Sequence, residues 1–316
     1  MNENDTPDND DDSIADGATG EQEQEQESSL LDSMDFGGFR SGFVTFVGRP
    51  NVGKSTLLNK ILGEKVSIVS DKPQTTRSQV RGVLHRDDMQ LVFVDTPGIH
   101  KPRGPLGKRL NESAESSIGD VDAVCVLIDA TMPIGPGDRW VIDRCPKDTI
   151  LVVNKTDKAN PEQVLEQLSG AAEFDLDAYF PVSALTGEGV DELVAHLASR
   201  MQEGPPYYPE DMVSDAADAF WVAELVREQL LGVLRDEIPH SIATRVTEME
   251  WPHVRCEILV ERDSQKGIVI GKKGSVLKKV GIEARKQLRE GTYLELQVKT
   301  SKNWQTEASI LDRLGY

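Results

Sequence analysis

A glycine-rich segment near the start of the chain has the residue types and spacing of a phosphate-binding loop. Gly48, Gly53, Lys54 and Ser55 match the pattern G-x-x-x-x-G-K-[ST]. Glycines at this spacing let consecutive backbone N–H groups point at one anion, and the following helix adds the positive end of its dipole. We expect Lys54 to bridge the β- and γ-phosphates of a nucleotide and Ser55 Oγ to bind Mg²⁺. The expected phosphate-binding residues are Asn51, Val52, Gly53, Lys54, Ser55, Thr56 and Gly98.

A second motif, Asp-Thr-Pro-Gly, runs from Asp95 to Gly98 and directly follows the apolar run 91–94. An Asp at the carboxyl end of a buried strand faces the crevice in which open α/β sheets bind their ligands. We therefore expect Asp95 to hold Mg²⁺, through water, and the Gly98 N–H to meet the γ-phosphate. Taken alone, the segment also fits an ordinary turn. The phosphate loop upstream argues against that alternative.

A third motif, Asn-Lys-Thr-Asp, occupies residues 154–157 and also follows an apolar run. The carboxylate of Asp157 can accept both the N1–H and the 2-amino group of guanine. Adenine lacks this donor pair and would leave the carboxylate unpaired, so the motif selects guanine. We expect Asn154 to brace the neighbouring loops and the stem of Lys155 to cover the face of the base.

The segment Ser183-Ala184-Leu185 supplies the last expected part of the guanine site. The N–H of Ala184 is expected to reach guanine O6. Three motifs in this order, each at the end of an apolar run, are very unlikely to arise by coincidence. They predict a guanine-nucleotide site.

These motifs, spread over residues 42–202, are similar to those of the TrmE-Era GTPases. The segment Pro73-Gln74-Thr75-Thr76-Arg77 matches the first switch of that family, although by itself it reads as a polar loop. The resemblance implies that Thr76, or less directly Thr75, binds Mg²⁺ together with Ser55 and Asp95.

Two residues bear on how fast such a site hydrolyses GTP. Ras-like enzymes carry a water-orienting Gln directly after the Asp-x-x-Gly motif, where this chain has Ile99. Intrinsic turnover is therefore expected to be slow. In some members of the family, the Asn equivalent to Asn51 binds K⁺ near the phosphates. The resemblance extends this role to Asn51, with a hydrogen bond that only shapes the loop as the alternative.

The final third of the chain carries a concentration of positive charge. Residues 262–302 hold eleven Lys and Arg against four Asp and Glu, a local charge of +7 in a chain whose formal charge is −19. Such a patch indicates a nucleic-acid partner. A basic helix face exposed only to water is the alternative.

A short glycine motif within this patch favours nucleic acid. The segment Gly271-Lys272-Lys273-Gly274 lies between two expected helices, and its glycines let a phosphodiester backbone approach closely. The whole run 267–274 resembles the KH motif, whose groove takes about four single-stranded nucleotides. We expect Trp251 and Trp304 to be packing residues rather than base platforms. The expected RNA-binding residues are Ile268, Ile270, Gly271, Lys272, Lys273, Gly274 and Lys278.

Two groups of elements are needed to position these residues. Short, nearly continuous apolar runs predict parallel strands buried on both faces, and helical patterns between several of them complete a three-layer α/β sheet. The expected strands of this first part are 43–47, 91–94, 124–128, 150–153 and 178–182. The expected helices are 54–62, 106–118, 137–145 and 190–201.

The proline-containing segment 204–209 is expected to link two domains, because its prolines stop the preceding helix. We place a GTPase domain at 39–203 and a second, α+β domain at 210–316. The elements expected beyond the linker are helix 216–234, strands 241–249 and 253–261, helix 264–270, helix 275–289 and strand 293–300. This order resembles a type II KH domain.

Composition sets the remaining limits. Residues 1–38 hold 13 acidic residues and no Lys or Arg, so we expect a disordered acidic tail, either merely solvated or competing with RNA for a basic surface. Without the tail the formal charge is −6. Three cysteines without zinc-site spacing indicate a reducing cytosol. The N-terminus is too acidic for a signal peptide, and no apolar run approaches a membrane span, although peripheral membrane contact stays open.

A GTPase domain followed by a type II KH arrangement closely resembles the Era family over residues 40–316. The resemblance implies a monomer that binds GTP, GDP and the 3′ end of 16S rRNA and assists assembly of the small ribosomal subunit in the cytoplasm. Two alternatives remain. One is a related GTPase acting on tRNA modification or on the large subunit, and the other is an RNA-binding protein that binds nucleotide without useful turnover.

Overall fold

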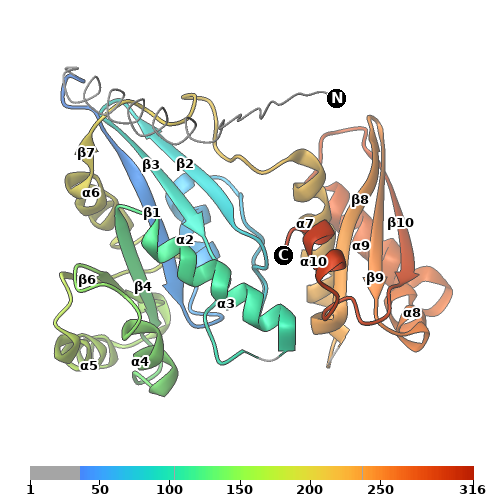
Figure 1. The fold of residues 1–316 in the computed structure, drawn as a ribbon, viewed down its shortest axis with the longest axis horizontal. Coiled ribbons are helices and arrows are strands. Elements are labelled where there is room, and N and C mark those ends of the chain that lie inside the picture. Colours follow the sequence, from blue (N-terminus) through green and yellow to red (C-terminus); the bar gives the residue numbers. More distant parts are fainter. Residues whose placement is uncertain (1–35, 103, 237) are drawn as a thin grey trace, which may run out of the picture.

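The computed structural model describes residues 36–102, 104–236 and 238–316, which form two β-sheets with their own helices (Figure 1). The expected acidic tail therefore lies outside the described residues, apart from its last three. No helix within the described ranges is long and apolar enough to cross a membrane.

The first sheet has seven strands in the described part of the chain, in the order β2-β3-β1-β4-β5-β6, with β7 paired to β1. Pairings are parallel except β2 with β3 and β1 with β7, so the predicted mostly parallel sheet is confirmed. The strands are β1 (Arg40–Gly48), β2 (Val80–Arg86), β3 (Met89–Asp95), β4 (Ala123–Asp129), β5 (Ile150–Asn154), β6 (Ala178–Pro181) and β7 (Gln202–Glu203).

Helices cover both faces of this sheet (Figure 1). They are α2 (Lys54–Leu62), α3 (Gly104–Gly119), α4 (Pro136–Ile142), α5 (Pro161–Ala171) and α6 (Val190–Arg200). Helix α5 was not predicted from the sequence. It begins with a capping box at Asn160 and a proline in its first turn. It also missed the edge strand β2, whose polar residues interrupt the apolar run.

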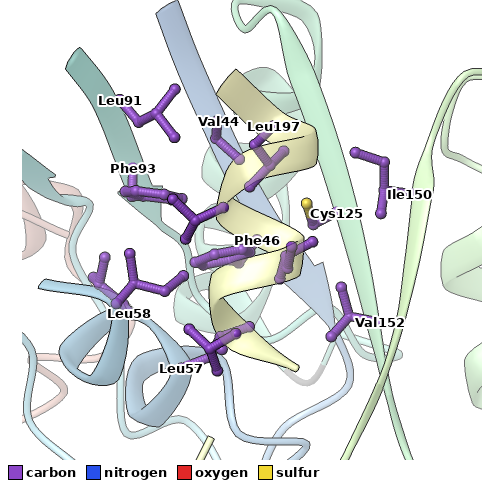
Figure 2. Packing of buried hydrophobic residues seen from close by; sticks show 14 of the residues in the cluster. Val44, Phe46, Leu57, Leu58, Leu91, Phe93, Cys125, Ile150, Val152 and Leu197 are labelled. Carbon is purple, nitrogen blue, oxygen red and sulfur yellow. The ribbon is translucent and has the colours of Figure 1, made fainter. Parts of the chain in front are cut away.

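The core of this domain explains why the strands read as apolar runs. Phe46 packs under α6 with Leu57 and Leu197, as Figure 2 shows, whereas its neighbour Val47 points into a second cluster on the opposite face. Because both faces of β1 are covered, consecutive residues are apolar. Burial of Phe46 alone contributes about 2 kcal/mol of transfer free energy.

The second sheet has the order β10-β9-β8, with β8 antiparallel and β10 parallel to β9. Its elements are α7 (Asp218–Val233), β8 (Ile242–Glu250), β9 (His253–Val260), α8 (Asp263–Ile270), α9 (Ser275–Arg285), β10 (Tyr293–Thr300) and α10 (Ala308–Leu314). The predicted order helix, strand, strand, helix, loop, helix, strand is confirmed. Helix α9 ends four residues earlier than expected.

The two sheets meet through a shared apolar cluster. Leu106 and Leu110 on α3 pack with Trp304 and Leu311 beside the second sheet, and the C-terminus lies between the two sheets (Figure 1). The connecting segment after β7 stays on the first sheet, because Gln90 Oε1 accepts hydrogen bonds from the backbone of residues 207 and 208. The proposed boundary at 204–209 falls inside this segment.

Candidate nucleotide site and nucleic-acid interface

The phosphate loop joins β1 to α2 and leaves Lys54 buried at the start of the helix. Gly53 has φ 105°, and a Cβ on it would lie 2.2 Å from Asn154 Nδ2, so a larger residue cannot take its place. Lys54 is only 6% exposed, and its Nζ donates to the carbonyl oxygens of Gly48 and Arg49 at 3.2 and 3.3 Å. Burial lowers the pKa of Lys54 to about 8, although Asp95 acts in the opposite direction.

A pocket of about 50 Å³ lies over this loop. It brings together most of the residues that the sequence assigned to phosphate and to the first switch. Its lining includes Asn51, Gly53, Lys54, Ser55, Thr56, Thr75, Thr76 and Gly98. Val52 lies outside this lining and is buried in the core instead, while its carbonyl accepts a hydrogen bond from Asn154 Nδ2 at 2.8 Å.

The three expected Mg²⁺ ligands converge in the structure. Ser55 Oγ lies 2.8 Å from Asp95 Oδ2 and 3.1 Å from Thr76 Oγ1, and Thr76 Oγ1 lies 3.4 Å from the same carboxylate oxygen. Asp95 is fully buried, which raises its pKa, and its Oδ1 has no hydrogen-bond partner among the described residues. Three hard oxygens beside an orphaned carboxylate oxygen fit a magnesium ion.

The geometry distinguishes between the two candidate switch threonines. The hydroxyl of Thr75 donates to the carbonyl oxygen of Lys72 at 2.7 Å and so turns away from Asp95, whereas Thr76 faces it. Ser67 also reaches Asp95 Oδ2, at 2.6 Å, and was not anticipated. Ser67 lies in a loop with no recognisable motif, so only the fold reveals its place.

The segment after Asp95 closes tightly over the phosphate loop. A Cβ on Gly98 would lie 2.9 Å from the backbone nitrogen of Pro50, so only glycine fits this approach. Ile99 is completely buried and its N–H bonds the Gly48 carbonyl, so its side chain points into the core and not at the pocket. The side-chain amide of Asn51 donates to the Asp71 carbonyl at 2.8 Å.

The guanine motif is held by a network around Asn154. Its Oδ1 accepts from the N–H groups of Lys155 at 2.8 Å and Ala184 at 3.0 Å. Asn154 thus braces two loops, and the Ala184 N–H that we expected to meet guanine O6 is paired with Asn154 in this structure. Leu185 is exposed beside it.

The proposed base-reading carboxylate is oriented by a neighbour. Ser183 Oγ donates to Asp157 Oδ1 at 2.7 Å, and Asp157 is exposed on the surface that a base would cover. Lys155 Nζ bonds the Asn51 carbonyl at 2.7 Å and Asp129 Oδ2 at 2.6 Å, which extends its stem across this site. Asp129 was not anticipated, although its place at the end of a buried strand is a usable signal.

The Gly271–Gly274 loop is an open counterpart to the phosphate loop. Gly271 and Gly274 have φ of 76° and 77°, and a Cβ on Gly271 would lie 2.6 Å from Val276 Cγ2. Lys272 and Lys273 are both exposed on a single 3₁₀ turn between α8 and α9.

Apolar side chains are exposed beside these lysines. Ile268 on α8 is 52% exposed and Ile270 is 36% exposed, whereas Val269 between them is buried in the core. Lys278 is exposed one turn into α9. Exposed isoleucines next to a cationic glycine loop give a surface suited to unstacked bases and a phosphodiester backbone.

The two tryptophans of this domain differ. Trp304 is completely buried, as expected, and its Nε1 donates to the Ser241 carbonyl at 3.1 Å. Trp251 lies at the β8–β9 turn and is 58% exposed, so it packs on the surface and not in the core, with the Arg289 guanidinium 4.6 Å from its ring centroid. A turn residue at the tip of a sheet has too few neighbours to bury an indole.

Comparisons with known proteins match both domains. Residues 43–155 match the family model described as 50S ribosome-binding GTPase, and residues 237–305 match the KH domain model. The chain is 46% identical over 293 residues to GTPase Era of Clostridium botulinum, covering 88% of this chain and 99% of that protein. It is 46% identical over 296 residues to GTPase Era of Mycobacterium avium, with the same coverage.

Two solved structures share the whole architecture. One is a variant of Era from Aquifex aeolicus bound to GDP and AlF4⁻, and the other is Era in complex with MgGDPNP and nucleotides 1506–1542 of 16S ribosomal RNA. Each has a TM-score of 0.84 and 38% identity, and each match covers 88% of this chain and 99% of the other. Sequence motifs, two-domain fold and relatives point the same way: this chain belongs to the Era family of GTPases and hydrolyses GTP.

Proposed function

We propose that this chain is a GTP-driven switch that binds 16S rRNA near its 3′ end and assists maturation of the small ribosomal subunit. The observation that carries the proposal is the presence, in one chain, of a phosphate-loop pocket, a guanine motif braced by Ser183 and an exposed cationic KH loop. The solved Era complex with MgGDPNP and nucleotides 1506–1542 of 16S rRNA, at a TM-score of 0.84, supports the choice of RNA.

In this proposal, Ser55, Thr76 and Asp95 hold Mg²⁺, and Lys54 binds the β- and γ-phosphates. The ion neutralises charge on the phosphates when it is bound. The residues of the chain orient the nucleotide: the glycine loop cradles the phosphates, and Asp157, held by Ser183, reads the guanine edge.

Slow turnover follows from the buried side chain of Ile99, which leaves no residue at that position to orient water. We propose that K⁺ beside Asn51 partly compensates, because Asn51 lines the phosphate pocket. The test is hydrolysis by the full chain in matched K⁺ and Na⁺ salts at equal ionic strength. Faster turnover in K⁺ is expected, and equal rates would contradict the proposal.

RNA binding is proposed to depend on the nucleotide. Thr76 and the Gly98 N–H would be held in place while Mg²⁺ and the γ-phosphate are bound, and both loops would be released after hydrolysis. The loop that contains Thr76 contacts the second domain directly, as the hydrogen bond from Val69 N to Glu228 shows. We expect higher affinity for an RNA with the 3′ sequence of 16S rRNA in a non-hydrolysable GTP analogue than in GDP. Equal affinities would overturn the coupling.

The identity of the RNA is tested by crosslinking in cells and sequencing the bound RNA. Recovery of the 3′ region of 16S rRNA is expected. Recovery of tRNA or of large-subunit rRNA would favour the related GTPases that act on those molecules.

We further propose that the protein works as a cytoplasmic monomer with domains at 39–203 and 210–316 joined by 204–209, and that any membrane contact is peripheral.

A further inference from the structure

The second domain places a buried arginine against the switch loop of the first domain, residues 63–79, which contains Thr76. Arg227 on α7 is completely buried, and its Nη2 donates to the backbone carbonyl of Thr75. The same guanidinium pairs with Glu224 one turn earlier on the helix, with Nε 2.7 Å from Oε1. A charge-assisted hydrogen bond shielded from water is stronger than a pair on the surface, which contributes little.

The carbonyl that Arg227 binds belongs to the peptide bond that enters Thr76. Because a peptide unit is planar, fixing the Thr75 oxygen also fixes the orientation of the Thr76 N–H and restricts the direction of its side chain. Thr76 Oγ1 is the atom that lies 3.1 Å from Ser55 Oγ and 3.4 Å from Asp95 Oδ2. Arg227 therefore reaches the expected magnesium site through one peptide unit.

The same helix holds the switch loop at a second point. Glu228 accepts hydrogen bonds from Lys65 Nζ at 2.5 Å and from the Val69 backbone N–H at 3.0 Å. Within the described structure, residues 63–79 form no helix or strand, so the loop has no ladder of its own to fix its backbone. Its geometry depends on anchors from outside.

A third anchor follows Thr76 directly. Arg77 is 2% exposed, its Nη1 donates to the Ile242 carbonyl at 2.6 Å, and its guanidinium lies 5.6 Å from the Trp304 ring centroid. The Mg²⁺-binding threonine thus lies between two contacts to the second domain. The GTPase domain supplies the ligands, and the second domain sets the position of one of them.

We propose that Arg227 is a positioning residue for GTP hydrolysis, acting from the second domain through the Thr75 carbonyl to orient Thr76 toward Mg²⁺. This inference rests on the assignment of Thr76 as the switch threonine in the proposed function. Loss of the contact between Arg227 and the Thr75 carbonyl slows hydrolysis and raises the Mg²⁺ concentration needed for half-maximal rate. Affinity for GDP is not affected, because the switch threonine is ordered by the γ-phosphate.

The test uses the full chain with Arg227→Met and Glu224→Gln together. This double variant removes the contact of Arg227 with the Thr75 carbonyl and leaves no buried carboxylate unpaired. Without RNA, kcat for GTP is expected to fall by about tenfold and the Mg²⁺ concentration for half-maximal rate to rise. GDP affinity should be unchanged. The matched control, Arg245→Met with Glu257→Gln, removes the pair of Arg245 with Glu257, and with it the pair of Glu257 with Lys299, between strands β8, β9 and β10 of the second sheet, and should behave as wild type.

A second variant keeps the charge and guards against misfolding. In Arg227→Lys the ammonium is a compact point charge without the planar fork by which the guanidinium reaches Glu224 and the Thr75 carbonyl together, so pairing with Glu224 draws it away from the Thr75 carbonyl. A fall in kcat of about threefold with the same change in Mg²⁺ dependence is expected. Wild-type kinetics in Arg227→Lys and in the double variant, or equal losses in the Arg245 control, would overturn the inference.

Thr76→Ala separates this inference from the proposed function. If Thr76→Ala slows hydrolysis while the Arg227 variants do not, the switch assignment stands and only the inference fails. If Thr76→Ala leaves both rate and Mg²⁺ dependence unchanged, the switch assignment itself fails, and the inference fails with it.

Discussion

Two glycine loops of this chain carry lysine, and they use it in opposite ways. Lys54 in the phosphate loop is 6% exposed and donates to two backbone carbonyls, whereas Lys272 and Lys273 in the Gly271–Gly274 loop are exposed. Both loops need glycine at positive φ, with 105° at Gly53 and 76° at Gly271. Both loops therefore depend on a glycine at positive φ, and they differ in whether their lysine side chains are buried.

Burial decides what each lysine can recognise. An enclosed ammonium is desolvated and fixed, so it favours one phosphate geometry and interacts strongly with it. An exposed ammonium is hydrated and screened by salt, so it attracts any phosphodiester backbone with modest strength. We therefore expect large, specific losses at the nucleotide site and graded, salt-dependent losses at the proposed RNA surface.

The largest effect is expected at the enclosed lysine. Lys54→Ala removes the only side-chain cation that lines the phosphate pocket in the described structure, and kcat/KM for GTP should fall by about 10³. Steady-state hydrolysis measures it. Lys60→Ala, an exposed lysine on the same helix, serves as the control and should keep wild-type kinetics. A loss below about tenfold in Lys54→Ala would show that burial does not strengthen the interaction of the Lys54 ammonium with the phosphates.

The next largest effect tests how specific the enclosed site is. Asp157→Asn replaces the acceptor that Ser183 orients with a side chain that also donates, so GTP affinity should fall by about 100-fold while xanthosine triphosphate gains. Competition binding with the two nucleotides measures the change. Asp191→Asn, an exposed acid on α6, should leave guanine preference intact. Unchanged preference in Asp157→Asn would remove this residue from the base site.

A smaller effect is expected at the open loop. Lys272→Ala with Lys273→Ala should weaken RNA binding by about tenfold and reduce the salt dependence by roughly 1.4 log units per log unit of salt, because two phosphate contacts are lost. GTP hydrolysis by the free protein should not change.

RNA titration at several salt concentrations measures this effect. Lys108→Ala with Lys147→Ala removes the same charge from exposed sites of the GTPase domain and should have little influence. Equal losses in both pairs would mean that overall charge, and not the loop, binds RNA.

The parts of the molecule that were predictable are those with local rules. The phosphate loop, the guanine motif and the KH loop each depend on residue types at fixed spacing, and the runs around Phe46 and Val152 depend on burial of both strand faces. Strand β2 was not predicted, because an edge strand mixes polar and apolar residues.

The contacts between the domains were not predictable. Arg77 and Arg227 lie 150 residues apart in sequence, in a polar loop and in a helix, and no pattern marks either as buried. Their burial depends on partners such as Trp304 and Glu224 that only the folded chain brings near. Local motifs thus reveal the two sites, and tertiary contacts reveal how the sites are joined.

The smallest expected effect is a pH dependence peculiar to the enclosed lysine. Burial lowers the pKa of Lys54 to about 8 in the nucleotide-free protein, and bound phosphates favour the protonated form, so the complex retains a proton that the free protein loses. Nucleotide affinity should therefore fall as pH rises through about 8, by less than tenfold per pH unit.

The same shift acts on stability with the opposite sign. The unfolded chain holds its lysine proton up to a pKa of 10.5, whereas the folded free protein releases it near 8, so this group makes the folded state more stable as pH rises between the two values.

Calorimetric titration with GDP between about pH 7 and pH 9, in buffers of different ionisation enthalpy, should show proton uptake on binding. Binding without proton uptake across this range would show that Lys54 is already protonated in the free protein, and that the enclosed loop desolvates its lysine less than the comparison requires.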